Sequence, residues 1–116
     1  MKTVAERFVE DAYDNGGATV NAFGTTPKVG YMVSVFPAAE QVHPILTPKI
    51  VEDYFYTWNV ELRDPNIYVG AWMVPEVGCY LDLSVREDDL SRAFMLGRDA
   101  KQLAIFDLKS GKEIRL

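Results

Sequence analysis

The sequence has very few of the side chains that build most catalytic and metal sites, with one cysteine and one histidine among 116 residues. Cys79 alone cannot form an intramolecular disulfide, and it cannot complete a zinc site together with a lone histidine. The HExxH, CxxC and EF-hand patterns are absent, as is the GxxxxGK[ST] loop that holds phosphate. We therefore predict no metal and no cofactor, and we favour a non-enzymatic role over an enzymatic one.

Long apolar runs and clusters of basic residues are also missing. No segment approaches the roughly 18 to 20 apolar residues that cross a bilayer, and the N-terminus carries acidic residues where a signal peptide is apolar. The net charge is −5, with acidic and basic residues interleaved, which disfavours direct nucleic-acid binding. We expect a soluble cytoplasmic protein without membrane contact. A further alternative is a DNA-mimic inhibitor.

The composition that is present belongs to a globular protein, with 48% hydrophobic and 25% charged residues. This length predicts one domain over residues 1–116. Helix signals fall at 4–15, 48–64 and 89–101. Strand signals fall at 18–24, 30–36, 68–74, 79–85, 103–107 and 113–116. The order α-β-β-α-β-β-α-β-β predicts an α+β fold with a mostly antiparallel sheet packed against helices.

Several of these elements have clear local signals. Thr3 and Glu6 fit a capping box at the first helix, and Thr47-Pro48 fits the start of the second. The strand at 79–85 alternates strictly, with cysteine, leucine and valine on one side and tyrosine, aspartate and serine on the other. Residues 37–46 hold two prolines and no periodicity, so we expect an irregular connection there. The apolar run at 103–106 predicts an interior strand covered on both faces.

Two pairs of side chains could carry chemistry, and each has a simpler interpretation. Cys79 and His43 could form a thiol–imidazole dyad, but Cys79 falls in the buried set of its strand, where a free cysteine is usually a small apolar residue. Asp82 and Asp107 could neighbour each other and share a proton. We expect them instead to be solvated strand residues.

The second helix has more apolar residues than a single core stripe needs. Val51, Phe55, Trp58 and Leu62 form the stripe. Tyr56 and Val60 then fall on the opposite side, where they predict an interaction patch. Our predicted partner-binding residues are Tyr54, Tyr56, Val60, Val42 and Ile45. The alternative is that the 37–46 segment covers this surface.

The C-terminal half resembles small uncharacterised proteins of actinobacterial phages and mobile elements. The resemblance rests on the segments DPNIYVGAWMV, CYLDLSV, AFMLGRDAKQLAIFDL and GKEIRL, in roughly residues 64–116. It implies an accessory protein made inside a bacterial host, with no activity that can be transferred. It also implies that Gln102 and Asp107 cap or stitch the final hairpin.

Two classes of function follow from these features. The favoured hypothesis is a non-enzymatic accessory protein that binds a host or phage protein, or a second copy of itself, through the patch at 54–60 and 37–46. The alternative is a small-ligand-binding domain or minor enzyme with an aromatic pocket. The aromatic residues predicted to line that pocket are Trp58, Trp72, Tyr68 and Tyr80.

Overall fold

A computed structural model describes all residues, 1–116, as three α-helices and a seven-stranded sheet. The helices are α1 (Val4–Asn15), α2 (Pro48–Thr57) and α3 (Leu90–Asp99). The strands are β1 (Gly17–Val20), β2 (Tyr31–Ser34), β3 (Gln41–His43), β4 (Ile67–Val74), β5 (Gly78–Glu87), β6 (Ala104–Asp107) and β7 (Lys112–Arg115). Pro37–Ala39 and Glu61–Arg63 form 3-10 turns. None of the helices has the length and apolar character that crossing a membrane requires.

The predicted helix caps are present at Thr3 and Thr47, and one helix is shorter than expected. At α1 the Thr3 hydroxyl accepts from the Glu6 amide, and the Glu6 carboxylate accepts from the Thr3 amide. The helix α2 starts at Pro48 as predicted but ends at Thr57 instead of residue 64. There the Asn59 side chain donates to the Tyr56 carbonyl at 2.5 Å, so a side chain competes with the backbone for a helical acceptor.

The α+β prediction is confirmed, because every strand pair is antiparallel and the strand order is β1-β4-β5-β2-β6-β7. The segment 37–46 is not wholly irregular, since β3 pairs with the first part of β5. Three residues flanked by proline-containing turns are too few to show an alternating pattern. The expectation that 103–106 is covered on both faces is wrong, because Leu103 precedes β6 and is 74% exposed.

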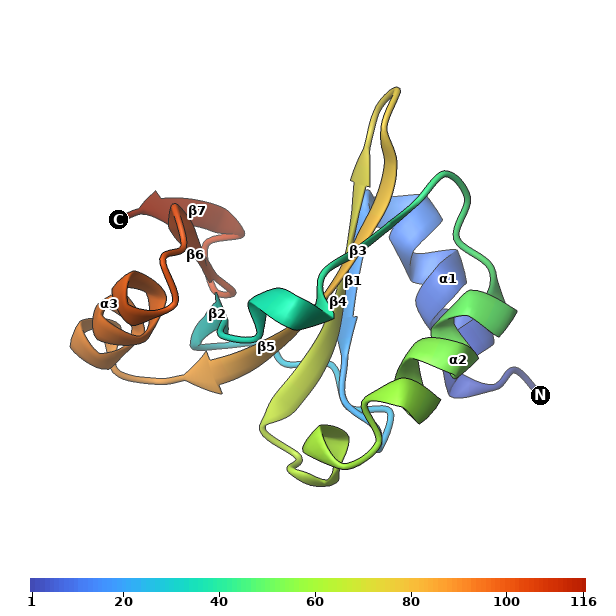
Figure 1. Cartoon of the computed structure of the whole chain (residues 1–116), viewed down its shortest axis with the longest axis horizontal. Coiled ribbons are helices and arrows are strands. Elements are labelled where there is room, and N and C mark those ends of the chain that lie inside the picture. The colour runs from blue at the N-terminus through green and yellow to red at the C-terminus, as the bar shows by residue number, and fades with distance from the viewer.

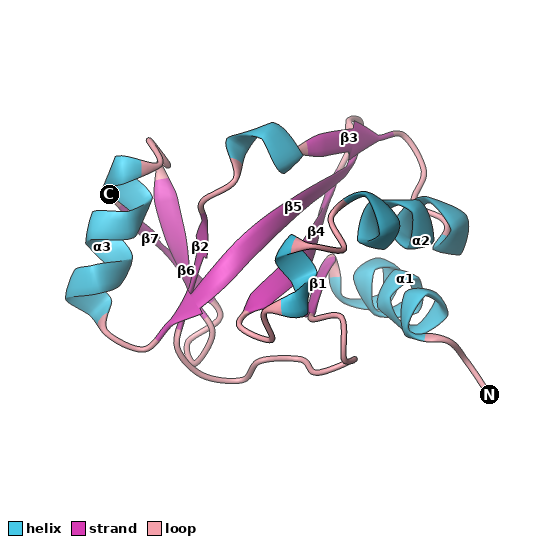
Figure 2. Cartoon of the chain, turned by 60° about the horizontal axis from the view of Figure 1, so that its bottom comes forward, coloured by secondary structure: helices cyan, strands magenta, loops and turns pink.

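Figures 1 and 2 show α1 and α2 side by side at one end of the sheet and α3 at the other end. The strand register nevertheless places all three helices on one face of this twisted sheet. Cys79, Leu81 and Leu83 of β5 lie on this face, fully buried in the main core with α1 and α2. A second cluster joins β2, β6 and α3 through Val33, Ala93 and Ile105. Val33 is the register partner of Val85, which follows Leu83 on the same face of β5. The other face of the sheet therefore has no helix.

The helix-free face is strongly curled. Trp72 of β4 pairs with Tyr80 of β5, while Phe106 of β6 aligns through Met32 with Arg86 of β5. In a flat sheet these two positions would be about 14 Å apart across the strands and roughly 20 Å apart along them. The Trp72 and Phe106 rings are nevertheless 6.2 Å apart, edge to face. The curl therefore folds β6 over β4 and makes this face concave.

Candidate functional site

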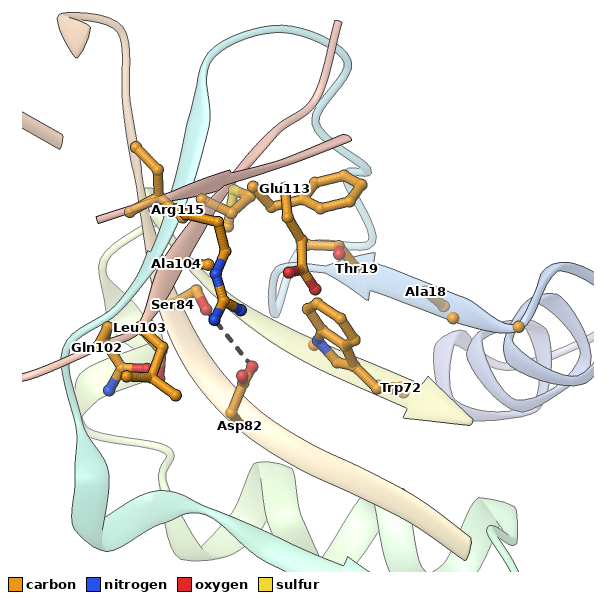
Figure 3. A pocket seen from close by; sticks show the side chains of 18 of the residues that line it. Ala18, Thr19, Trp72, Asp82, Ser84, Gln102, Leu103, Ala104, Glu113 and Arg115 are labelled. Atoms are coloured by element: carbon orange, nitrogen blue, oxygen red, sulfur yellow. Dashed lines mark hydrogen bonds between the residues drawn. The ribbon is translucent and has the colours of Figure 1, made fainter. Parts of the chain in front are cut away.

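The concave face encloses a cavity of about 720 Å³. Its walls come from β1, β2, β4, β5, β6 and β7, together with the C-terminal end of α1 at 15–16 and the segment 101–103. The side chains that line it include Thr19, Met32, Ser34, Trp72, Asp82, Ser84, Lys101, Gln102, Phe106, Glu113 and Arg115. Figure 3 shows Trp72, Asp82, Glu113 and Arg115 reaching this space from three different strands, β4, β5 and β7. The strand β7 is not a neighbour of β4 or β5 in the sheet, so it is the curl of the sheet that brings these side chains together.

Asp82 lies on the β5 strand where the neighbour of that strand changes. Residues 79–81 pair with β3 and residues 84–87 pair with β2, while Gly70 of β4 lies opposite Asp82 on the other side. A Cβ atom on Gly70 would lie 2.6 Å from Asp82 Oδ1, closer than atoms of side chains approach. The absence of a side chain at residue 70 therefore lets the carboxylate lie over β4.

The carboxyl group of Asp82 is partly buried and lacks a cation. Burial raises its pKa to about 6, while the hydrogen bond from Ser84 acts to lower it and the charge of Glu40 acts to raise it. The Ser84 hydroxyl donates to Asp82 Oδ1 at 3.4 Å. None of the three ion pairs in the protein includes Asp82. Proton release or cation binding at this carboxyl group is therefore possible near neutral pH.

The remaining charged groups of the cavity lie at its rim. Lys101, Glu113 and Arg115 are all exposed to solvent. Arg115 projects over the same side of the cavity as Asp82 in Figure 3, but its guanidinium forms no ion pair with that carboxylate. The interior of the site thus combines one carboxyl group, hydroxyl groups and two aromatic rings.

The predicted partner-binding residues do not form one surface. Tyr54 is buried in the core, and its hydroxyl donates to the Ala39 carbonyl at 2.8 Å. Its predicted place in an exposed patch is therefore wrong, because the ring points into the main core and its hydroxyl reaches the 3-10 turn at 37–39. Tyr56, Val60 and Ile45 are exposed by 80%, 61% and 65%.

Val42 is also exposed, but it lies on the other side of the sheet. It pairs with Tyr80, which pairs with Trp72, and cross-strand partners share a face. Val42 therefore belongs to the concave face, whereas α2 packs on the opposite one. The patch that the sequence predicts is divided between two sides of the molecule.

The predicted aromatic pocket is correct for one of its four residues. Trp72 lines the cavity. Tyr80 and Tyr68 lie on the same face but outside the cavity lining, and Tyr68 is buried. Trp58 packs against the core on the helix side, with its indole nitrogen buried and unpaired.

Cys79 and His43 are direct cross-strand partners. Their side chains nevertheless do not bond each other, and each has a different partner. The imidazole Nε2 bonds the Gln41 side-chain oxygen at 2.8 Å, and the thiol donates to the Tyr80 carbonyl at 3.5 Å. Cys79 is fully buried, and burial raises its pKa. The thiol is thus kept protonated and away from any cavity, as a core residue would be. No group of three or more histidine, cysteine or acidic side chains is arranged to hold a metal ion.

Asp82 and Asp107 do not form a carboxylate pair. Asp107 aligns through Tyr31 with Glu87, well along β5 from Asp82. Its carboxylate accepts from the Lys109 amide at 3.0 Å and stabilises the final turn, in line with the stitching role that the resemblance implies. Asp82 itself is not the solvated strand residue that we predict. An isolated glycine within a predicted strand, Gly70, is the sequence signal for such a close approach.

Comparison of this chain with protein-family models, with curated proteins and with solved structures finds no match. The functional argument therefore rests on the geometry of the cavity.

Proposed function

We propose that this protein binds a small organic molecule in the cavity of the concave sheet face. The observation that carries the proposal is the Asp82 carboxyl group, which faces the cavity without a cation and in a space that Gly70 leaves free. A volume of about 720 Å³ is within the usual range for small-molecule sites, which are commonly apolar with a few polar groups. Aromatic rings beside a carboxyl group fit this description.

The first experiment is a thermal-shift screen of amines, amino acids, nucleobases and carboxylic acids. A ligand that binds only the folded state at ten times its Kd stabilises it by about 1.4 kcal/mol. For a domain of this size that is a rise in Tm of several degrees. A screen in which no compound raises Tm at millimolar concentration would contradict the proposal.

Two substitutions locate the binding of any compound found. Trp72→Ala removes an aromatic wall of the cavity, and we expect it to weaken binding by about tenfold or more, as loss of a well-packed aromatic contact does. Tyr80→Ala is the matched control, because Tyr80 is the cross-strand partner of Trp72 but lies outside the lining. Equal binding by the two variants would place the ligand elsewhere.

A second candidate function is the binding of a protein partner through the end of α2. Tyr56 and Val60 are large, exposed and free of core contacts, and tyrosine is common at interfaces. In the phage or mobile-element setting that the resemblance implies, the partner is a host or phage protein. Binding of a purified candidate partner that is lost in Tyr56→Ser, Val60→Ser and kept in Trp72→Ala would favour this function over the first.

A further inference from the structure

One charged side chain of the cavity, Asp82, lies inside it, and the other three lie at its rim. Lys101, Glu113 and Arg115 are exposed, so water screens them and their contribution to ligand binding is small. Asp82 lies deeper, on β5, with no cation within ion-pair distance. Any molecule that fills the cavity therefore meets Asp82 as the carboxyl group that solvent screens least.

The hydrogen bonds of Asp82 leave most of its capacity unused. An ionised carboxylate can accept about four hydrogen bonds, and this one accepts a single long bond, from Ser84 at 3.4 Å to Oδ1. No protein donor bonds Oδ2. A partly buried carboxylate is stabilised by charge-assisted donors, and the protein supplies none on this side. The donors that the site lacks are those of an ammonium or amidinium group.

The aromatic wall lies where the rest of such a molecule would extend. Gly70 faces Asp82, and Trp72 is the next residue of β4 on the same face, so the indole is a diagonal neighbour of the carboxylate. Phe106 meets the indole edge to face. An aromatic face beside a carboxylate attracts cations, both through the ring and through the charge.

We infer that the ligand of this cavity is a small organic cation, whose ammonium or amidinium group binds Asp82 and whose flat apolar body lies against Trp72 and Phe106. This inference rests on the proposed function and specifies its ligand class. An anion would meet repulsion from Asp82, and a neutral molecule of the same shape would leave the carboxylate without charged donors.

Three probes of one shape test the inference: benzamidine is cationic, benzamide is neutral and benzoate is anionic. Each is titrated into the whole protein at neutral pH, with tryptophan fluorescence and calorimetry as readouts. We expect benzamidine to bind about tenfold to a hundredfold more tightly than benzamide, the usual gain from a charged hydrogen bond, and benzoate to bind least. Asp82→Asn should remove the preference for benzamidine, and circular dichroism checks that the variant is folded.

A second variant keeps the carboxylate and changes its position. Gly70→Ala places a methyl group against Oδ1, so it should weaken benzamidine binding while benzamide binding changes less. Equal binding of benzamidine and benzamide, with a response from Trp72, would overturn the cation inference but leave the cavity as a binding site. Binding of none of the three probes would also overturn it, whereas the proposed function is judged by the broader screen and by Trp72→Ala.

Discussion

Replacing Asp82 by asparagine should make the protein more stable at neutral pH. The pKa of this carboxyl group is raised to about 6 from 3.8, chiefly by burial. The folded state thus holds the proton more tightly than the unfolded chain does, and ionisation costs folding free energy. Each factor of ten in acidity corresponds to about 1.4 kcal/mol, so the cost is about 3 kcal/mol at most. Water that enters the cavity hydrates the carboxylate and so reduces this cost in folding free energy.

The sign of the pH dependence follows from the raised pKa. Below about pH 3 the group is protonated in both states and contributes nothing. Between about pH 4 and pH 6 the unfolded chain ionises first, so the contribution of Asp82 to the free energy of unfolding falls as pH rises. Above about pH 7 the loss is complete. Asp82→Asn is neutral throughout, so its advantage over the parent should grow from about 0.5 kcal/mol at pH 4 to about 1–3 kcal/mol at pH 7.5.

The assay is urea denaturation of the parent and the variant at several pH values between 4 and 8. Other groups that titrate in this range cancel when the two curves are subtracted. Asp11→Asn is the control, since Asp11 lies exposed on α1 with no ion pair, and we expect its difference curve to be flat. A variant less stable than the parent at pH 7.5, or a difference that does not change with pH, would refute the argument that Asp82 is desolvated.

Three further predictions concern residues outside the cavity. Tyr54→Phe should cost about 1–3 kcal/mol, because the buried carbonyl of Ala39 loses its donor; equal urea midpoints for variant and parent would contradict the buried bond. Cys79 should react with a thiol reagent only as fast as the protein unfolds, since the thiol is buried with a raised pKa; rapid labelling of the native protein would show an accessible thiol. Tyr56→Ser and Val60→Ser should each change stability by less than about 0.5 kcal/mol, as exposed residues usually do, and a large fall in Tm would show that they are packed.

Local signals in the sequence predict most of the secondary structure. The capping box at Thr3 and the Thr47-Pro48 start depend only on residues next to each other in the chain, so the helix starts are correct. The alternation along 79–85 correctly predicts which side of β5 is buried. The strand β3 is missed because its three residues are ordered by pairing with β5 and carry little local preference of their own. The end of α2 is misplaced because the side chain of Asn59 competes for a carbonyl.

The sequence does not predict most of the candidate site, because it does not show that these residues meet in one cavity. Trp72 can be predicted as a pocket aromatic, and Gly70 is a hint of close packing. The sequence cannot show that Phe106 meets Trp72, because the contact depends on the curl of the sheet.

The sequence by itself determined an α+β domain with one buried face of β5, because hydrophobic period and capping are local properties of the chain. Tertiary structure alone decided that all helices share one face, that the opposite face curls into a cavity, and that Asp82 lies inside it. The physical reason is that a strand pattern shows which residues leave the core but not what they meet on the other side. Here β6 and β7 fold over that side, and a carboxylate that alternation assigns to water lies in a cavity instead.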